Sequence, residues 1–248
     1  MKISIITVVY NNEKTILDSI NSVRNQTYKN IEHIFIDGGS LDNTLKIINE
    51  NISCNSIIIS EKDDGLYHAM NKGIKVATGD IIGILNSDDV YDNFNVIEHI
   101  ANHFISDSKL KILYGDLVYV KADDIDIQIR YWESKNITAN YFENGYVPPH
   151  PTLFITKDVY NSVGLFDLNF KLAADYEFIL RLFKKHSFKS LYLPLLIVRM
   201  RLGGVTNKKY FNIYKQNIEI LNSWKVNKLE IPAFFIFKRF FIKIKQYF

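Results

Sequence analysis

The sequence predicts an α/β fold: a three-layer, doubly wound, mostly parallel sheet followed by a C-terminal helical extension. Two observations predict this class. As far as residue 85, apolar β-branched segments alternate with segments whose apolar residues recur at helical spacing, which is typical of βαβ units around a parallel sheet. The strand segments are also apolar at nearly every position, which indicates strands that are covered on both faces.

The expected elements follow one another closely up to residue 85. Strands are expected at residues 3–10, 31–37, 56–60 and 81–85. The helices between them carry three apolar sets, which are Ile16, Ile20 and Val23; Leu45 and Ile48; and Leu66, Met70, Ile74 and Ala77. Asp42 is placed to cap the second of these helices.

After residue 89 the alternation is looser. We expect a helix at 96–104, a strand at 112–120, a solvated turn at 123–126, a short strand at 152–155 and a helix at 158–163. Three prolines at 148, 149 and 151 remove backbone donors, so residues 146–151 are expected to form an extended wall. The segment 175–185 is apolar on almost all sides, which predicts a buried helix.

Composition sets broad limits on function. Of the 248 residues, 47% are apolar and 23% are charged, as in an ordinary globular protein. The single cysteine, Cys54, leaves no intrachain disulfide and fits a reducing compartment. No run approaches the roughly 20 apolar residues of a membrane span, and a cytoplasmic protein is expected. A net charge of +3 does not indicate nucleic-acid binding.

One motif points to metal-assisted chemistry. The apolar segment 81–85 stops at Asn86-Ser87-Asp88-Asp89. Strands of an open α/β sheet present their carboxyl ends to the binding crevice, and carboxylates bind hard divalent cations that carry a diphosphate. The alternative is a polar turn that only ends the strand.

Three further loops are expected at the same edge. The first offers Thr7, Tyr10 and Asn11. The second, 37–44, begins Asp37-Gly38-Gly39, where glycine permits a close backbone approach before a helix N-terminus. It either holds part of a nucleotide or is a glycine turn capped by Asp42, and it matches neither the dinucleotide fingerprint nor the phosphate loop of NTPases.

The third of these loops, 63–73, contains Asp64, Asn71 and Lys72. An acidic turn followed by a helix with an amide and an amine suits ribose and phosphate contacts. A capped surface helix has the same pattern.

Together these segments resemble the family 2 glycosyltransferases, whose nucleotide-sugar-binding α/β domain is called GT-A. The matching segments are 5–11, 37–44, 71–73, 77–80 and 85–89. Further on, segments 149–152, 164–167 and 174–182 resemble the acceptor half of bacterial surface-polysaccharide members. The resemblance implies a GT-A domain at 1–206, with a nucleotide-binding half at 1–90 and an acceptor half at 91–206, followed by the extension at 207–248.

The resemblance also implies roles for single residues. Thr7, Tyr10 and Asp37 would surround the nucleotide base, Asp88 would bind Mn²⁺ or Mg²⁺ with Asp89 nearby, and Asp175 would be the catalytic base of an inverting transfer. A different role for Asp175 is to cap the buried helix.

Two departures from the family pattern matter. Asn86 stands where many relatives have Asp, which leaves Asp88 as the metal ligand and makes Asn86, with Ser87, a donor contact. Ala174 stands where Glu is frequent, which removes an acid that relatives have for the acceptor.

Two other residues have open alternatives. His150, between prolines, is expected either to bind an acceptor hydroxyl or to be structural. Arg201, with Arg199, either reaches the diphosphate from a closing loop at 203–206 or ends a strand in solvent.

The tail is basic and aromatic. Residues 231–248 contain four cations and no acid, and at helical spacing one arc is apolar while the cations and Gln246 lie opposite. The cations are Lys238, Arg239, Lys243 and Lys245, and the arc consists of Ala233, Ile236, Phe237, Phe240, Phe241, Ile244, Tyr247 and Phe248. Such a helix suits a peripheral anchor on the inner face of the cell membrane. The alternative is packing against the domain or a second subunit.

By resemblance, the expected activity is transfer of a sugar from a nucleotide diphosphate-sugar, with a UDP-sugar as the expected donor. The acceptor would be a glycan or lipid-linked oligosaccharide of a surface polysaccharide such as O-antigen or capsule. Two alternatives are a sugar-phosphate nucleotidyltransferase, whose glycine-rich loop with a basic residue is missing after the first strand, and a non-catalytic protein that binds a nucleotide-sugar or a partner.

Overall fold

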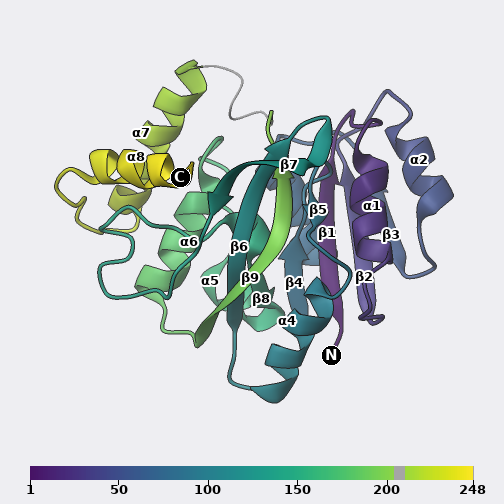
Figure 1. Ribbon diagram of the computed structural model, residues 1–248, viewed down its shortest axis with the longest axis horizontal. Helices are drawn as coiled ribbons and strands as arrows, with labels where there is room; N and C mark the ends of the chain where they lie inside the picture. The colour runs from purple at the N-terminus through teal and green to yellow at the C-terminus, as the bar shows by residue number, and fades with distance from the viewer. Residues whose placement is uncertain (204–209, 248) are drawn as a thin grey trace.

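The computed structural model describes residues 1–203 and 210–247, and a single mixed sheet runs through these residues (Figure 1). Its main path has the order β3-β2-β1-β4-β8-β6-β9-β5, and β7 pairs with β6 beside this path. The strands are β1 Ile3–Val9, β2 Ile31–Asp37, β3 Ser56–Ser60, β4 Ile81–Ile84, β5 Val90–Tyr91, β6 Ile112–Lys121, β7 Asp124–Trp132, β8 Phe154–Thr156 and β9 Ser190–Arg201.

The first four strands are parallel and follow the predicted alternation. Helices α1 Ile16–Arg24, α2 Thr44–Asn51 and α3 Leu66–Val76 connect them. Two local expectations differ from the structure. Asn43, not Asp42, occupies the N-cap position of α2, although Asp42 still accepts the Thr44 N–H at 3.0 Å. Leu66 is half exposed because it begins α3 ahead of the turns that face the sheet.

Helices cover both faces of the sheet, which confirms the three-layer arrangement. Apolar residues of α1 and α2 pack with Val9 and Phe35, and those of α4 Val96–Ser106 pack with Ile3 and Ile5. On the other face α3, α5 Lys157–Val163 and α6 Ala174–Lys185 pack with Ile6. Successive side chains of a strand point to opposite faces, so an almost continuously apolar β1 feeds both layers.

In the second half the sheet becomes antiparallel at three places. β8 inserts antiparallel between β4 and β6, β5 pairs antiparallel with β9, and β7 pairs antiparallel with β6. The solvated turn predicted at 123–126 is wrong from residue 124 onward, where β7 begins. Isoleucines at every second position from Ile125 to Ile129 form the alternating pattern of a strand, and two of them are exposed. The polar residues between them made the segment resemble a solvated turn.

The proline-rich wall also differs in part from its prediction. Residues His150–Thr152 form one 3-10 turn, in which Leu153 N–H donates to His150 O at 3.1 Å. Pro151 lies within the first two positions of this turn, where its missing N–H costs nothing. The following strand is therefore Phe154–Thr156 rather than 152–155.

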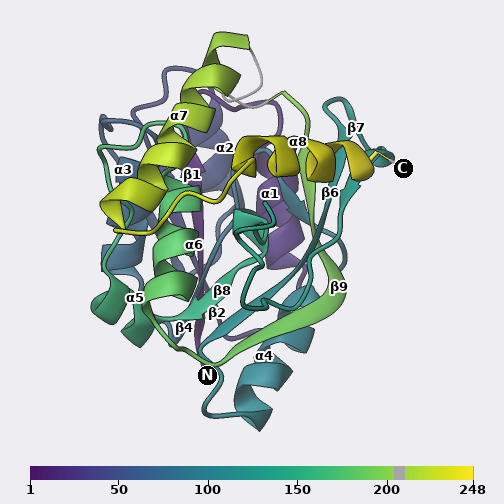
Figure 2. The same ribbon diagram turned by 90° about the vertical axis from the view of Figure 1, so that its left-hand side faces the viewer.

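The tail forms two helices, α7 Tyr210–Val226 and α8 Phe235–Lys245, which pack on the domain (Figure 2). The indole N–H of Trp224 in α7 donates to the Tyr176 hydroxyl of α6 at 3.0 Å. In α8, Phe235 and Arg239 are buried, while Phe237, Phe240 and Phe241 are exposed. The prediction that Arg239 lies on a solvated face is therefore wrong. Within the described residues, most of the predicted apolar arc faces outward, whereas Ile236 packs against the core.

Some expectations fall outside the described residues. These are residues 204–206 of the closing loop and Phe248 of the apolar arc, and the division of the chain at residue 206 stays a prediction. None of the helices within 1–203 and 210–247 is both long enough and apolar enough to span a membrane.

Candidate functional site

The loops after β1, β2 and β4 are joined into one rim at the carboxyl ends of the parallel strands. Asn11 connects the first two loops, because its N–H donates to Ser40 Oγ at 2.8 Å and its Oδ1 accepts the Leu41 N–H at 2.8 Å. Asn12 connects the loop after β1 to the loop after β4 by donating from Nδ2 to Ser87 Oγ at 2.8 Å. The sequence prediction that these loops converge therefore has a direct geometric basis.

Asp37 organises the turn that follows β2. Its buried Oδ2 accepts the N–H groups of Gly39 at 3.1 Å and Ser40 at 3.0 Å, and the Ser60 hydroxyl at 2.7 Å. Gly39 has φ +83°, which only glycine adopts without strain. The carboxylate is thus fully used in shaping the turn, and any contact with a base edge would compete with these bonds.

Tyr10 presents the exposed surface beside this turn. Its side chain is 60% exposed, and it lies against Gly38, where an added Cβ would come within 3.4 Å of Tyr10 Cδ2. Thr7, by contrast, is fully buried, and its hydroxyl lies 2.9 Å from His33 Nε2. Burial lowers the pKa of His33 to about 3, so the ring is neutral. Tyr10 is the residue of the pair that a planar ligand can reach.

Residues of the 63–73 segment differ in their availability. Lys72 pairs with Glu61 and Asp63, each at 2.6 Å, whereas Asp64 is exposed. Asn71 is buried and uses both ends of its amide: Nδ2 donates to Phe166 O at 2.9 Å, and Oδ1 accepts the Phe166 N–H at 3.0 Å. Asn71 therefore joins α3 to the segment that precedes α6.

The acidic turn after β4 contains one engaged and one available carboxylate. Asp89 is fully buried and accepts the Arg201 N–H at 3.2 Å and Asn86 Nδ2 at 3.0 Å. Burial and the charge of Asp88 raise the pKa of Asp89. Asp88 is partly exposed, and partial burial raises its pKa. Among the described residues, no other side chain donates a hydrogen bond to the Asp88 carboxylate.

Asn86 adds a second available oxygen to this turn. Its Oδ1 is buried and has no hydrogen-bond partner within the described part of the chain. A buried acceptor is normally paired. Asp88 and Asn86 thus offer two oxygen acceptors on one turn. No group of three potential acidic, His or Cys ligands is gathered anywhere in residues 1–203 and 210–247.

Arg201 closes this turn from β9. The residue is buried, its Nη1 donates to Asp88 O at 2.6 Å, and its Nη2 pairs with Asp18 at 2.5 Å. The alternative of a solvated strand end is therefore wrong for Arg201. Arg199 pairs with Asp92 at 2.8 Å. The two arginines thus fix the end of β9, Arg201 to the acidic turn and α1, and Arg199 to Asp92 just after β5.

Asp175 lies at the second position of α6, and its Oδ1 accepts the Tyr67 hydroxyl at 2.9 Å. Burial and the charge of Asp175 raise the pKa of Tyr67 well above its ordinary value, so the hydroxyl stays protonated and donates. The capping alternative for Asp175 is wrong, because Ala173 occupies the N-cap position. Glu219 of α7 instead accepts the N–H groups of Leu172 at 2.8 Å and Ala173 at 2.9 Å.

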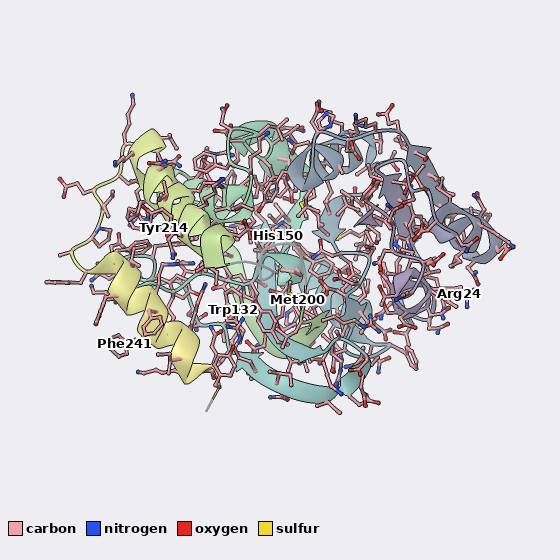
Figure 3. All side chains as sticks on the ribbon, turned by 90° about the horizontal axis from the view of Figure 1, so that it is seen from above. Arg24, Trp132, His150, Met200, Tyr214 and Phe241 are labelled. Atoms are coloured by element: carbon pink, nitrogen blue, oxygen red, sulfur yellow. The ribbon has the colours of Figure 1, made fainter. Side chains whose placement is uncertain are left out.

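His150 borders the same region. Its ring packs edge-on against Phe166 with 5.4 Å between ring centres, and it lies near the middle of the molecule in Figure 3. Burial lowers the pKa of His150, and the charge of Asp175 opposes this shift. The imidazole is therefore neutral at neutral pH.

Tyr119 of β6 is a buried residue of the acceptor half. Burial raises the pKa of Tyr119, Arg130 opposes this shift, and the charges of Asp89 and Asp175 add to it. The sequence analysis missed Tyr67, Tyr119 and Arg130; Arg130 lies in the strand that was not predicted, and tyrosines carry no spacing signal.

A family model described as Glycosyl transferase family 2 matches residues 4–157 of the chain. An uncharacterized glycosyltransferase of Mycobacterium tuberculosis is 32% identical over 182 residues, which cover 72% of this chain and 68% of the relative.

Two solved structures share the fold. Residues 1–349 of Staphylococcus aureus TarS, in complex with UDP-GlcNAc, superpose with a TM-score of 0.72 and 20% identity, covering 99% of this chain and 74% of that one. This chain spans 43% of a longer TarS structure. The mannosyltransferase PcManGT of Pyrobaculum calidifontis, in complex with GDP-Man and Mn²⁺, has a TM-score of 0.64 and 13% identity, covering 97% and 69%.

Proposed function

The chain belongs to glycosyl transferase family 2, and from this premise we propose that it transfers a sugar from a UDP-sugar to a glycan acceptor with inversion at the anomeric carbon. We further propose that the acceptor belongs to a surface polysaccharide such as O-antigen or capsule. One observation carries the proposal: the partly exposed carboxylate of Asp175 accepts a hydrogen bond at 2.9 Å from Tyr67 of α3, a helix that begins at the same edge of the parallel strands as the acidic turn after β4.

We assign the donor to the rim formed by the loops after β1, β2 and β4. Tyr10 offers an exposed ring for the base, while Asn11, Asp64 and Asn86 are polar groups that border the rim. Six predicted donor residues are engaged within the protein, and we assign them to shaping the rim: Thr7, Asp37, Asn71, Lys72, Ser87 and Arg201.

The residues of the acidic turn fit a divalent cation. Asn86 Oδ1 is a buried oxygen without a partner, and Asp88 provides a carboxylate beside it. Such a site, with few protein ligands, suits Mg²⁺ or Mn²⁺ that is shared with phosphate oxygens. Asp88 and Asn86 would hold the ion, and Asp89 would support the turn from behind. When bound, the ion would neutralise charge on the departing diphosphate.

Asp175 is assigned as the general base. Tyr67 fixes Oδ1, so Oδ2 is the oxygen that accepts the proton of the acceptor hydroxyl. The hydroxyl oxygen forms a bond to the anomeric carbon from the side opposite the donor phosphate, and the bond from that carbon to the phosphate oxygen breaks. The nucleoside diphosphate leaves with the electron pair. The N-terminal end of α6 favours a carboxylate at this position.

The proposal is tested by a thermal-shift screen of nucleoside diphosphates and nucleotide-sugars with and without Mn²⁺. We expect UDP or a UDP-sugar to raise Tm in the presence of Mn²⁺, because a ligand that binds only the folded state stabilises it. Asp88→Asn should lose the Mn²⁺-dependent part of the shift, while Asp126→Asn on the exposed β7 strand should keep it.

Two results would contradict the proposal. If no nucleotide stabilises the wild type, the donor assignment is wrong. If Asp88→Asn retains the full Mn²⁺-dependent shift, the metal assignment is wrong, although the donor assignment stands.

A further inference from the structure

The inner face of α8 carries polar groups into the acceptor half. Phe235, Arg239, Ile242 and Gln246 follow helical spacing and face the protein. The Phe235 ring lies 5.2 Å from that of Trp224, and the Tyr131 N–H of β7 donates to Gln246 O at 3.0 Å. The helix therefore crosses from α7 to β7, over the side of the molecule that contains α6 (Figure 2).

Several buried polar atoms along this crossing have no partner. The Arg239 guanidinium lies 4.7 Å from the centre of the Tyr176 ring, and its Nε and Nη1 are buried without a hydrogen bond to any described residue. Arg130 Nε and Gln246 Oε1 are in the same condition. Buried guanidinium groups are almost always paired, so the N–H groups of Arg239 and Arg130 are open to an acceptor, while Gln246 Oε1 is open to a donor.

The charges at the crossing do not balance. Desolvation and the positive charges of Arg239 and Arg130 lower the pKa of Lys243 to about 8, and Asp175 opposes this shift. Arg130 lies over Tyr119, with 3.9 Å from its guanidinium carbon to the ring centre. Arg239 and Lys243 are one helical turn apart in α8, and Arg130 also lies 5.4 Å from the centre of the Tyr247 ring, one turn further on, so three like charges gather at this crossing.

We propose that Arg130, Arg239 and Lys243 form an anion subsite that binds a phosphate group carried by the sugar acceptor. A phosphate offers oxygen acceptors in the geometry that guanidinium N–H groups prefer, and its charge compensates the local excess. The position beside Asp175 places the anion on the acceptor rather than the donor, because the donor is assigned to the rim with Asp88. The assignment of the anion to the acceptor rests on the proposed function. The anion site itself does not.

The test measures anion binding without turnover. Inorganic phosphate and octyl phosphate are titrated calorimetrically into the wild type and into Lys243→Met and Arg239→Met. We expect about ten-fold weaker binding for each variant, because each loses a charge-assisted contact. Lys245→Met removes one cation from the same helix and should bind both probes like the wild type. Stronger binding of octyl phosphate than of inorganic phosphate would indicate a lipid-linked source.

The outcome is independent of the donor proposal. UDP with Mn²⁺ is titrated into the same proteins, and its affinity should not change in any variant. Equal phosphate affinity in the wild type and Lys243→Met would overturn the inference, even if UDP binding is as proposed. Lys243 has an exposed side chain, so this variant keeps the test decisive if Arg239→Met is unstable.

The outer face of α8 carries an independent inference. Six apolar side chains there are exposed, from 38% for Ile244 to 83% for Phe234. In Figure 3 Phe241 lies at the outer edge of the molecule and points away from it. An apolar face of this kind marks an interaction surface. Its members are Phe234, Phe237, Phe240, Phe241, Ile244 and Tyr247.

We infer that this face docks on an anionic lipid surface. Charge complementarity selects this partner, because Lys238 and Lys245 flank the aromatic residues and residues 231–248 contain no acid. Aromatic side chains on a basic helix are suited to the boundary between headgroups and acyl chains. A phosphate bound on the inner face of the same helix would then lie near the depth of the headgroups.

Co-sedimentation with vesicles tests this surface. Vesicles of phosphatidylcholine with about 30% phosphatidylglycerol should bind the wild type, and vesicles of phosphatidylcholine alone should bind it less. Replacing Phe237, Phe240 and Phe241 together by Ser should weaken binding roughly hundred-fold, from the lost apolar burial. Phe94→Ser removes an equally exposed phenylalanine elsewhere and should have no effect. A wild type that ignores anionic vesicles and forms a dimer through α8 would overturn this inference in favour of a second copy.

Discussion

The donor edge and the acceptor side of this molecule satisfy their buried polar groups differently. At the donor edge, Asp37 and Asp89 accept several hydrogen bonds from their own loops, and Asn86 Oδ1 and Arg201 Nε are exceptions. On the acceptor side, Arg239 and Arg130 have enclosed N–H groups without partners. We therefore expect the donor edge to be formed before a substrate arrives, and the acceptor side to be completed by what binds to it.

The strongest test of this division is Asp175→Asn. The amide keeps the size of the side chain but cannot take the acceptor proton, so turnover should fall by about 10²–10⁴-fold. Affinity for UDP with Mn²⁺, which belongs to the other region, should not change. Sugar transfer and nucleotide binding are measured in parallel, with Asp167→Asn as a control on the loop before α6. Unchanged turnover would remove Asp175 from the mechanism, whereas a wild type that binds UDP but transfers no sugar would leave the chain as a non-catalytic binding protein.

Glu32→Gln tests whether the donor half is stabilised by its own internal hydrogen bonds. Burial opposes ionisation of Glu32, but hydrogen bonds from Lys2, Thr78 and Ser4 outweigh burial and lower its pKa from 4.5 to about 2. A carboxylate with a lowered pKa stabilises the fold above its unfolded pKa. The variant should therefore lose about 2–3 kcal/mol in the free energy of unfolding at pH 7.

The pH dependence distinguishes this effect from a general loss of packing. The difference between wild type and Glu32→Gln should shrink as the pH falls from 4.5 toward 2, where the native carboxylate takes up its proton. Urea unfolding across this range measures it, with Glu50→Gln on the exposed end of α2 as a control. A difference that stays constant down to pH 2 would show that ionisation is not its cause.

The docking of α8 can be broken with one methyl group. Gly145 has φ +88°, and an added Cβ would lie 2.8 Å from the backbone nitrogen of Arg239. Gly145→Ala should thus cost about 2 kcal/mol of stability from strain and displacement of α8. Gly164 has the same φ, but an added Cβ would meet only Arg181 Nη1 at 3.4 Å. If both variants lower Tm equally, the contact with α8 contributes nothing.

The sequence predicted the donor half better than the acceptor half for a physical reason. Strands β1, β2 and β4 are buried on both faces and β3 is partly buried, and short helices separate them, so their apolar runs have clear ends. Strand β7 is exposed and polar at alternate positions, and it pairs with a neighbour in an antiparallel hairpin. The alternation of β7 was present in the sequence, but its isoleucines do not pack in the core, so the pattern did not indicate a buried strand.

The candidate site shows the same limit. Motif order was sufficient to predict that the loops carrying Asp37 and Asp88 meet at one edge, because parallel strands fix that geometry. Motif order could not predict that Asp89 and Asn71 would be used internally, since this depends on the backbone of Arg201 and Phe166, distant in sequence. The burial of Arg239 likewise depends on how α8 packs, which helical spacing alone does not determine.

The smallest predicted effect concerns the boundary between the two regions. Tyr67 belongs to α3 of the donor half, yet its hydroxyl donates to Asp175 Oδ1 at 2.9 Å. Tyr67→Phe should leave UDP affinity unchanged and lower kcat roughly ten-fold, because a hydrogen bond to a charged group that orients the base is lost. Tyr214→Phe, on exposed α7, is the control. A fall in UDP affinity with kcat unchanged would mean that Tyr67 contributes to donor binding. All of α3 would then belong to the donor region.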